Sequence, residues 1–152
     1  ANGIELRFLL PPQHARMLIT LREGGMWPVI EEIKRGIVQV LAEDASLHPG
    51  AEPFPLWNFY NFNSVTTEPV PAADAVQTRM QWHWETSHYT PASGNLVLDR
   101  VLGYTDTARN MPEDFGVLLT SANVEAELAR PQALALGGLV RQDDDLLSPI
   151  TR

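Results

Sequence analysis

The residues best suited to chemistry in this sequence gather in the short segment Trp82–His88, where Glu85 precedes His88 by three positions. A carboxylate at that spacing in a turn can approach one imidazole nitrogen and fix the tautomer, which leaves the other nitrogen free to take a proton. The segment lies just before a helix expected to begin near Pro91, a position where α/β proteins place functional loops. We therefore predict that His88 is a general base and that Glu85 orients it. A purely structural hydrogen bond between them is the alternative interpretation.

The same segment allows a second chemistry, in which side chains hold a metal ion. His83 and Glu85 would share one face of an extended chain, and His88 or His14 could complete a set of two histidines and one carboxylate. The sequence has no cysteine and no HExxH pattern, which are common markers of zinc sites. We therefore expect neither a metal nor any other cofactor, and a metal-dependent enzyme ranks third among the alternatives.

Further polar and aromatic side chains are candidates for contacts with a substrate. His14 follows Pro11 and Pro12, which end a predicted strand, so it either lies at the carboxyl edge of the sheet or caps the next helix. Asparagines after the second predicted strand could bind an oxyanion or a substrate, although loop asparagines are also ordinary turn formers. The predicted binding residues are His14, Asn58, Asn63, Ser64, Trp82 and Tyr89.

Strands and helices must position these residues, and the hydrophobic pattern predicts both. Runs of apolar, β-forming residues predict strands at Ile4–Leu10, Leu56–Tyr60 and Phe115–Leu119. Apolar residues at helical spacing predict helices at His14–Arg22, Trp27–Leu41, Pro91–Leu102 and Ser121–Leu128. Two strands joined through helices imply a crossover connection and a parallel pair. The expected fold class is α/β, a three-layer unit with a small, mainly parallel sheet.

The second predicted helix has the clearest amphipathic pattern, with apolar residues recurring at helical spacing. Its expected core face consists of Trp27, Ile30, Ile33, Ile37, Val40 and Leu41. Its expected solvent face consists of Glu31, Glu32, Lys34, Arg35 and Gln39. In contrast, the segment Asn61–Thr78 shows neither helical nor strand periodicity and is expected to be a long irregular loop.

Composition narrows the range of partners. The sequence holds 11 basic and 19 acidic residues, a formal net charge of −8, and its basic residues are scattered. This charge makes nucleic acid and anionic membranes unfavourable partners. The apolar runs are shorter than the roughly 20 residues needed to span a bilayer, so we expect no membrane span. The absence of cysteine excludes disulfides and a thiolate nucleophile.

The segment Glu85-Thr86-Ser87-His88-Tyr89, followed by Gly94 and the helix Leu96–Leu102, resembles the last block of SGNH (GDSL-type) hydrolases. In that family Asp-x-x-His supplies two members of a Ser-His-Asp triad just before the C-terminal helix, and Glu85 stands where the aspartate is usual. Longer segments resemble the C-terminal half of uncharacterised bacterial proteins of SGNH-like type: Phe8–Ala15, Trp57–Phe59 with Asn63–Pro69, and Met80–Tyr89. The resemblance covers most of Ile4–Leu128 and implies a flavodoxin-like or SGNH-like fold.

The resemblance also implies a nucleophile that this sequence does not contain. The family carries its serine in a Gly-Asp-Ser block near the start of the domain, and no Gly-Asp-Ser occurs here. We therefore expect residues 1–142 to form an incomplete α/β domain, the C-terminal part of a longer SGNH-like protein, followed by an acidic tail at 143–152. The isolated chain is then expected to be inactive.

Three functions stay open at this point. The first is the base-bearing part of an ester hydrolase or O-acyl transferase, acting on a small-molecule or carbohydrate ester, with a periplasmic or envelope-associated location favoured over the cytoplasm. The second is a non-catalytic domain that binds a ligand or partner, which the missing serine favours. The third is a metal-dependent enzyme that uses His83, Glu85 and His88. Nothing in the sequence determines the oligomeric state.

Overall fold

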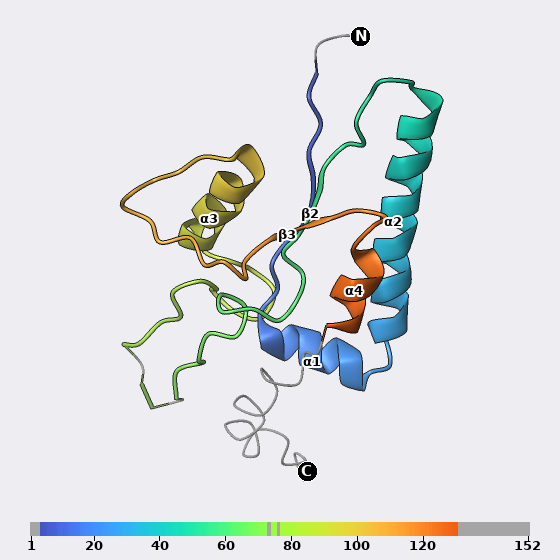
Figure 1. Ribbon diagram of the computed structural model, residues 1–152. Coiled ribbons are helices and arrows are strands. Elements are labelled where there is room, and N and C mark those ends of the chain that lie inside the picture. Colours follow the sequence, from blue (N-terminus) through green and yellow to red (C-terminus); the bar gives the residue numbers. More distant parts are fainter. Residues whose placement is uncertain (1–3, 73, 76, 131–152) are drawn as a thin grey trace.

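A sheet of three short strands forms the centre of the protein, of which the computed structural model describes residues 4–72, 74–75 and 77–130 (Figure 1). The strands are β1 (Phe8–Leu10), β2 (Leu56–Asn58) and β3 (Val117–Leu119), and they lie in the order β1-β2-β3. β1 runs parallel to β2, with Leu9 opposite Trp57, as the crossover argument predicts. β3 runs antiparallel to β2, so the sheet is mixed, and the expectation of a mainly parallel sheet is corrected.

The direction of β3 follows from the turn that precedes it. Arg100 donates to the carbonyls of Phe115 and Pro112, at 2.9 and 2.6 Å, and so ties this part of the chain to the helix before it. Gly116 then has a φ of +84°, a left-handed conformation that glycine adopts without penalty. The chain therefore enters the sheet beside the carboxyl end of β2, where Phe59 lies, and runs back along that strand.

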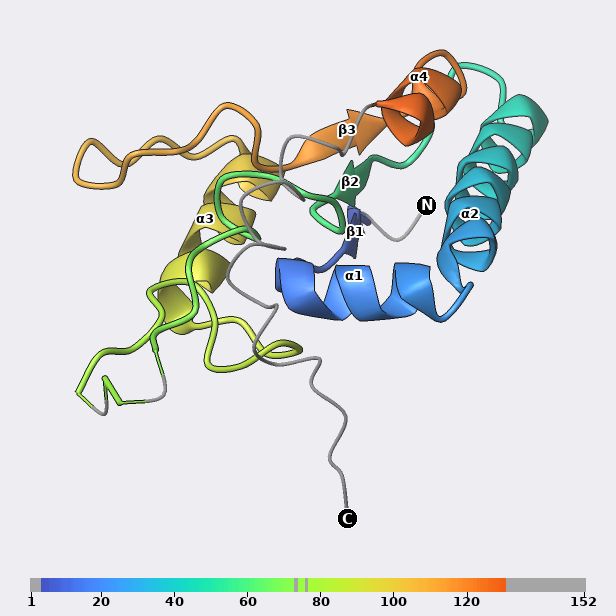
Figure 2. The ribbon, with the colours of Figure 1, turned by 90° about the horizontal axis from the view of Figure 1, so that it is seen from below.

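Helices lie on both sides of the sheet (Figures 1 and 2). Their bounds are α1 (Ala15–Glu23), α2 (Trp27–Leu47), α3 (Pro91–Leu102) and α4 (Val124–Ala129). α2 and α4 lie on one side, α3 lies on the other, and α1 lies below the carboxyl ends of β1 and β2 (Figures 1 and 2). None of the helices within the described residues is both long and apolar enough to cross a membrane.

The ends of α3 coincide with those expected from its sequence. The Oγ of Thr90 accepts from the backbone N–H of Ser93 at the N-terminus, and Pro91 occupies the first turn. Gly103 follows the last turn with a φ of +64° and provides a left-handed end. α2, in contrast, continues through Leu47 and does not end at Leu41.

Side chains alternate across the sheet and divide the core into two clusters. On the α3 side, buried residues pack together with Leu9 and Trp57: Phe59, Val65, Leu96, Val97, Val101 and Phe115. On the α2 and α4 side, Leu10 and Ile37 pack against a second set: Val38, Leu41, Leu56, Leu119 and Val124. Leu56 and Trp57 are neighbours that face opposite clusters, because consecutive strand residues point to opposite faces.

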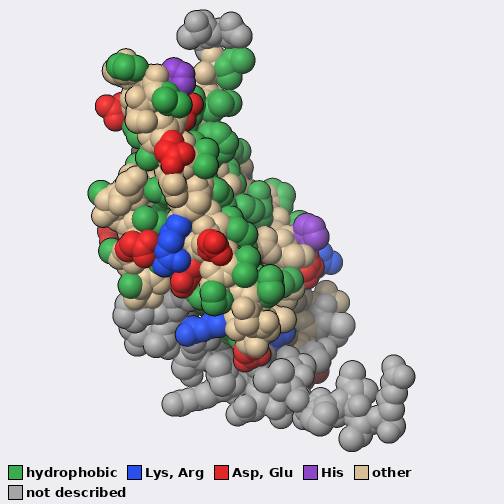
Figure 3. All heavy atoms as spheres, turned by 90° about the vertical axis from the view of Figure 1, so that its right-hand side faces the viewer, with side chains coloured by type: hydrophobic (Ala, Val, Ile, Leu, Met, Phe, Trp, Pro, Cys, Tyr) green, Lys and Arg blue, Asp and Glu red, His purple; other side chains and the backbone are tan. Residues whose placement is uncertain are grey.

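The face of α2 that meets the core differs from the expected one. The amphipathic pattern predicts that Ile33 and Val40 face the core, but they are 52% and 62% exposed, on a side of the protein where Figure 3 shows apolar side chains among charged ones. The same pattern predicts that Lys34 faces solvent, but Lys34 is buried, and its Nζ donates to the carbonyl of Tyr60 at 2.6 Å. That hydrogen bond gives the buried ammonium group one partner, and Val38 completes the inner face.

The acidic tail expected at 143–152, like the last part of the domain expected at 1–142, lies outside the described residues.

Lys34 makes stability depend on pH in the alkaline range. Burial lowers the pKa of Lys34 from 10.5 to about 8. Between these values the unfolded chain binds a proton that the folded chain does not, so Lys34 makes the free energy of unfolding rise as pH increases from about 8 to 10.5. Urea unfolding of the wild type and Lys34→Met across this range should show that rise in the wild type relative to the variant. Parallel curves would contradict the assignment.

Gly116→Ala tests the turn before β3. An added Cβ would lie 2.4 Å from Cε1 of Phe59, and the positive φ is itself unfavourable for alanine. We expect a loss of about 2–5 kcal/mol in unfolding free energy, measured by chemical denaturation. Gly50→Ala is the matched control, because Gly50 has the same φ of +84° but no atom within 4 Å of the added Cβ. Equal losses for the two variants would show that the Phe59 contact is unimportant.

Candidate functional site

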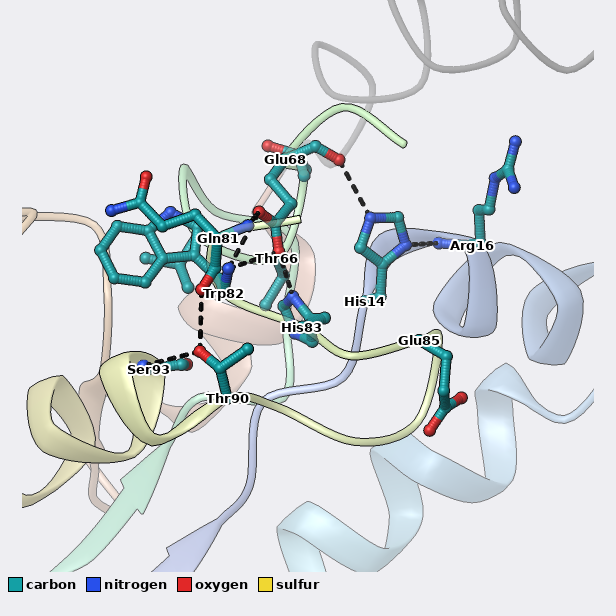
Figure 4. Close-up of polar contacts among 12 residues, drawn as sticks. His14, Arg16, Thr66, Glu68, Gln81, Trp82, His83, Glu85, Thr90 and Ser93 are labelled. Carbon is teal, nitrogen blue, oxygen red and sulfur yellow. Dashed lines mark hydrogen bonds and ion pairs between the residues drawn. The ribbon is translucent and has the colours of Figure 1, made fainter. Parts of the chain in front are cut away.

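Residues 82–90 fold back on themselves to form a short antiparallel turn, called here the 82–90 hairpin. It precedes α3 directly and lies near the N-terminus of α1 (Figure 4). The backbone contacts that define it are Thr90 N–H to Trp82 O and Trp84 N–H to His88 O, both at 2.8 Å, and the bridge between His83 and Tyr89. Alternation along the hairpin then places Trp84 and His88 on the face opposite His83 and Tyr89.

Glu85 and His88 meet at the end of this hairpin. Nδ1 of His88 contacts Oε1 of Glu85, and the backbone N–H and the Oγ of Ser87 also bond that carboxylate, at 2.8 and 2.9 Å. The backbone hydrogen bond from Ser87, followed by the His88 contact, lowers the pKa of Glu85 to about 2. Glu85 is therefore ionised at neutral pH and is held by its own turn.

The His88 ring is open to solvent on its other side. Its side chain is 78% exposed, and among the described residues its Nε2 has no hydrogen-bond partner. Because Nδ1 faces a carboxylate, the proton on that nitrogen is held there and Nε2 carries the free lone pair. The structure thus brings together the two residues expected to form the base and its orienting partner.

A buried carboxylate that the sequence reasoning missed fixes the base of the hairpin (Figure 4). Glu68 lies in the irregular segment after β2, and its carboxylate accepts the backbone N–H groups of Gln81, at 2.7 Å, and Trp82, at 2.9 Å. The same carboxylate accepts Nδ1–H of the buried His83 at 2.8 Å. The one signal available in the sequence is a carboxylate within a long irregular loop, and other acidic residues, such as Asp74 in the same loop, share that feature.

His14 occupies the interior between Glu68 and α1. Its Nδ1 accepts the backbone N–H of Arg16 at 3.2 Å, so Nε2 carries the proton and donates to the backbone carbonyl of Glu68 at 3.0 Å. Burial is the main reason why the pKa of His14 is lowered. Of the two roles considered for His14, the geometry matches the helix cap, and a role in substrate binding has no support from it.

His83 packs edge-on against His14, with ring centroids 5.2 Å apart. Its Nε2 and the Oγ of Ser93 are buried and have no hydrogen-bond partner among the described residues. Leaving such a group unpaired costs about 1–3 kcal/mol, so the Glu68 contact and the surrounding packing must hold the ring against that cost.

The remaining predicted binding residues lie away from His88 or take part in local turns. Oδ1 of Asn58 accepts Tyr60 N–H, and Oδ1 of Asn63 accepts the backbone N–H of Val65, at 3.2 and 3.0 Å. Ser64 donates from its backbone and its Oγ to Asp114. The alternative interpretation, that the asparagines build turns, fits this geometry, whereas Ser64 makes a long-range contact. Trp82 is half-buried against the α3-side core, and Tyr89 is 36% exposed at the hairpin.

The metal-site alternative requires His83, Glu85 and His88 to face a common point. His83 lies in the interior against Glu68, whereas Glu85 and His88 lie in solvent at the hairpin end. Within the part of the chain that the structure describes, no three histidine or acidic side chains are placed to hold a metal ion.

We found no relative of this chain among known proteins. No protein-family model matches the chain, and neither a curated protein nor a solved structure is similar to it. The resemblance to SGNH hydrolases therefore gains no support from these comparisons.

Chemical labelling distinguishes the inner and outer histidines. Diethyl pyrocarbonate acylates an unprotonated ring nitrogen that solvent can reach, so His88 and the exposed His48 should be labelled in the folded protein. The buried His14 and His83 should react only after unfolding. Mass spectrometry of digests from folded and urea-treated protein measures all four sites. Protection of His88, or rapid labelling of His14 or His83 in the folded state, would contradict the arrangement.

Proposed function

We propose that this chain supplies the base and its orienting carboxylate for an acyl-transfer site, as part of an ester hydrolase or O-acyl transferase. The observation that carries the proposal is the contact between Glu85 and Nδ1 of His88, combined with an exposed Nε2. A base requires a fixed tautomer and an accessible lone pair, and this pair of residues provides both.

The proposed chemistry assigns one role to each residue. Nε2 of His88 takes the proton of a hydroxyl as its oxygen attacks the acyl carbonyl, and returns that proton to the alcohol that leaves. The imidazolium formed in between is stabilised by Glu85, which stays ionised because its pKa is about 2. The nucleophile is the serine of a Gly-Asp-Ser block, which the proposal places on a part of the protein outside these 152 residues.

The architecture supports this proposal. β1 and β2 are parallel, and the segments that follow them lead to His14 and Glu68. The backbone N–H of His14 donates to the carbonyl of Thr86 and the carboxylate of Glu68 accepts the N–H of Trp82, so both residues hold the hairpin. Ligands of open α/β proteins bind outside the carboxyl ends of such strands. Helices on both sides of the sheet agree with the three-layer, SGNH-like fold that we propose for the complete domain (Figure 2).

A non-catalytic domain that binds a ligand or partner is the second candidate. The observation that favours it is the high exposure of the His88 side chain, 78%, since a catalytic base works best where water is excluded.

Turnover by the full-length protein tests the first candidate. His88→Ala should reduce hydrolysis of a short-chain aryl ester by roughly 10²–10⁴-fold, because the proton then has no acceptor. Glu85→Gln should lower kcat by a smaller factor. The 152-residue chain alone should be inactive.

His48→Ala is the matched control, because His48 is also exposed and its Nδ1 also has a local partner, the carbonyl of Asp44 at 2.7 Å. Circular dichroism melting curves verify that each variant is folded. Unchanged turnover in His88→Ala would rule out the proposed base, and a full-length wild type without any esterase or transferase activity would favour the binding role.

A further inference from the structure

A line of exposed apolar side chains runs along the outer face of α2, on the side of the protein seen in Figure 3. Its members are between 44% and 77% exposed: Met26, Val29, Ile33, Val40 and Leu47. Four of them follow one another at intervals of seven residues, which is almost two whole turns of an α-helix, so they lie in one line along it. Ile33 and Val40 lie roughly 140–160° around the helix from the buried Val38. This line is called here the 26–47 stripe.

Gly36 lies in the middle of the 26–47 stripe, three residues after Ile33 and four before Val40. A glycine in a helix interior destabilises the helix relative to alanine. The fold gives no reason for this glycine, because a Cβ added to it would have no neighbouring atom within 4 Å. A missing side chain on an exposed helix face allows a second helix to approach the backbone closely. Gly36 thus marks a place where another helix fits against α2.

The charged residues of α2 that border the stripe all have the same sign: Glu32, Glu43 and Asp44. Among the described residues, none of these carboxylates is paired with a lysine or an arginine. The two basic residues of α2 lie elsewhere, since Lys34 is buried and Arg35 pairs with Glu125 of α4. A second copy of α2 on this stripe would bring like charges together, whereas a basic helix would bring opposite charges together.

We propose that the 26–47 stripe docks an amphipathic helix of another protein, which crosses α2 at Gly36 and carries lysine or arginine beside its apolar face. Burial of the apolar side chains supplies the affinity, and the acidic border selects the basic partner. This docking is independent of the chemistry proposed for His88.

Two designed peptides test the docking. Each has three heptads with leucine at positions a and d, and they differ only at e and g, which are lysine in one peptide and glutamate in the other; these like charges keep each peptide from pairing with itself. In fluorescence anisotropy titrations at low salt, the lysine peptide should bind the 152-residue chain at least about tenfold more tightly than the glutamate peptide. Equal affinities, or no binding of either peptide, would overturn the proposal.

Variants locate the binding surface. The double variant Ile33→Ser with Val40→Ser should weaken binding of the lysine peptide by at least about tenfold, because two apolar contacts are lost. Leu98→Ser with Leu102→Ser is the matched control, since these α3 residues are 52% and 59% exposed and Ile33 and Val40 are 52% and 62% exposed. The control should bind like the wild type. Equal weakening by both double variants would overturn the assignment to α2.

Gly36→Gln separates docking from folding, because the two should change in opposite directions. Glutamine favours the helix over glycine, so the urea midpoint of unfolding should rise. The added side chain occupies the space that the partner helix needs, so binding of the lysine peptide should weaken by at least about fivefold. A Gly36→Gln variant that binds as tightly as the wild type would overturn the crossing at Gly36.

Two other occupants of the stripe are distinguished by further measurements. Sedimentation should find the chain monomeric, and a dimer that dissociates in the Ile33→Ser and Val40→Ser double variant would overturn the proposal in favour of a second copy. The longer protein expected under the proposed function should bind the lysine peptide as tightly as the 152-residue chain does. Loss of binding there would show that the rest of the protein covers the stripe, and would overturn the proposal without affecting turnover by His88.

Discussion

The arrangement of the candidate site depends on one buried carboxylate, that of Glu68. It accepts two backbone N–H groups and one imidazole N–H, so three donors from the start of the hairpin converge on it. A buried carboxylate is tolerated only where hydrogen bonds replace its hydration, and these contacts meet that condition. Because breaking these hydrogen bonds would leave a buried carboxylate without partners, they hold the irregular segment after β2 against the hairpin that carries His88.

The histidines around this carboxylate divide into two kinds. His14 and His83 lie inside, where one caps α1 through Nδ1 and the other occupies one oxygen of Glu68. His88 lies outside, at the far end of the same hairpin, with a carboxylate of its own. His14 and His83 hold the backbone at the base of the hairpin. His88 lies in solvent, so its Nε2 has no hydrogen-bond partner among the described residues. The proposed base thus lies on a short hairpin whose first residues, Trp82 and His83, are held by hydrogen bonds to Glu68.

Local sequence rules were sufficient for some elements. Thr90, Pro91 and Gly103 define both ends of α3, because caps and the left-handed C-terminal position act within a single turn. The Glu85 and His88 contact is also local, since a spacing of three residues in a turn brings the two side chains together. The parallel pairing of β1 and β2 follows from the connection through helices.

Other features depend on contacts between residues far apart in the sequence, which local patterns do not predict. Lys34 lies inside, where its Nζ donates a hydrogen bond to the carbonyl of Tyr60, 26 positions away, and no helical periodicity contains that information. Ile33, the preceding residue, is exposed. β3 runs antiparallel to β2 after a turn in which Gly116 lies against Phe59, a contact that no local pattern predicts. Glu68 reaches residues 13 to 15 positions ahead, so its role could be seen only in three dimensions.

Hydrogen exchange at the backbone amides of Gln81 and Trp82 tests most directly whether Glu68 holds the hairpin. In the wild type both amides should be protected, because each donates to the buried carboxylate. In Glu68→Ala their exchange should become at least about tenfold faster while the amides inside α2 keep their rates, whereas Glu52→Ala, at an exposed position, should change neither. Unchanged protection of Gln81 and Trp82 in Glu68→Ala would contradict the account.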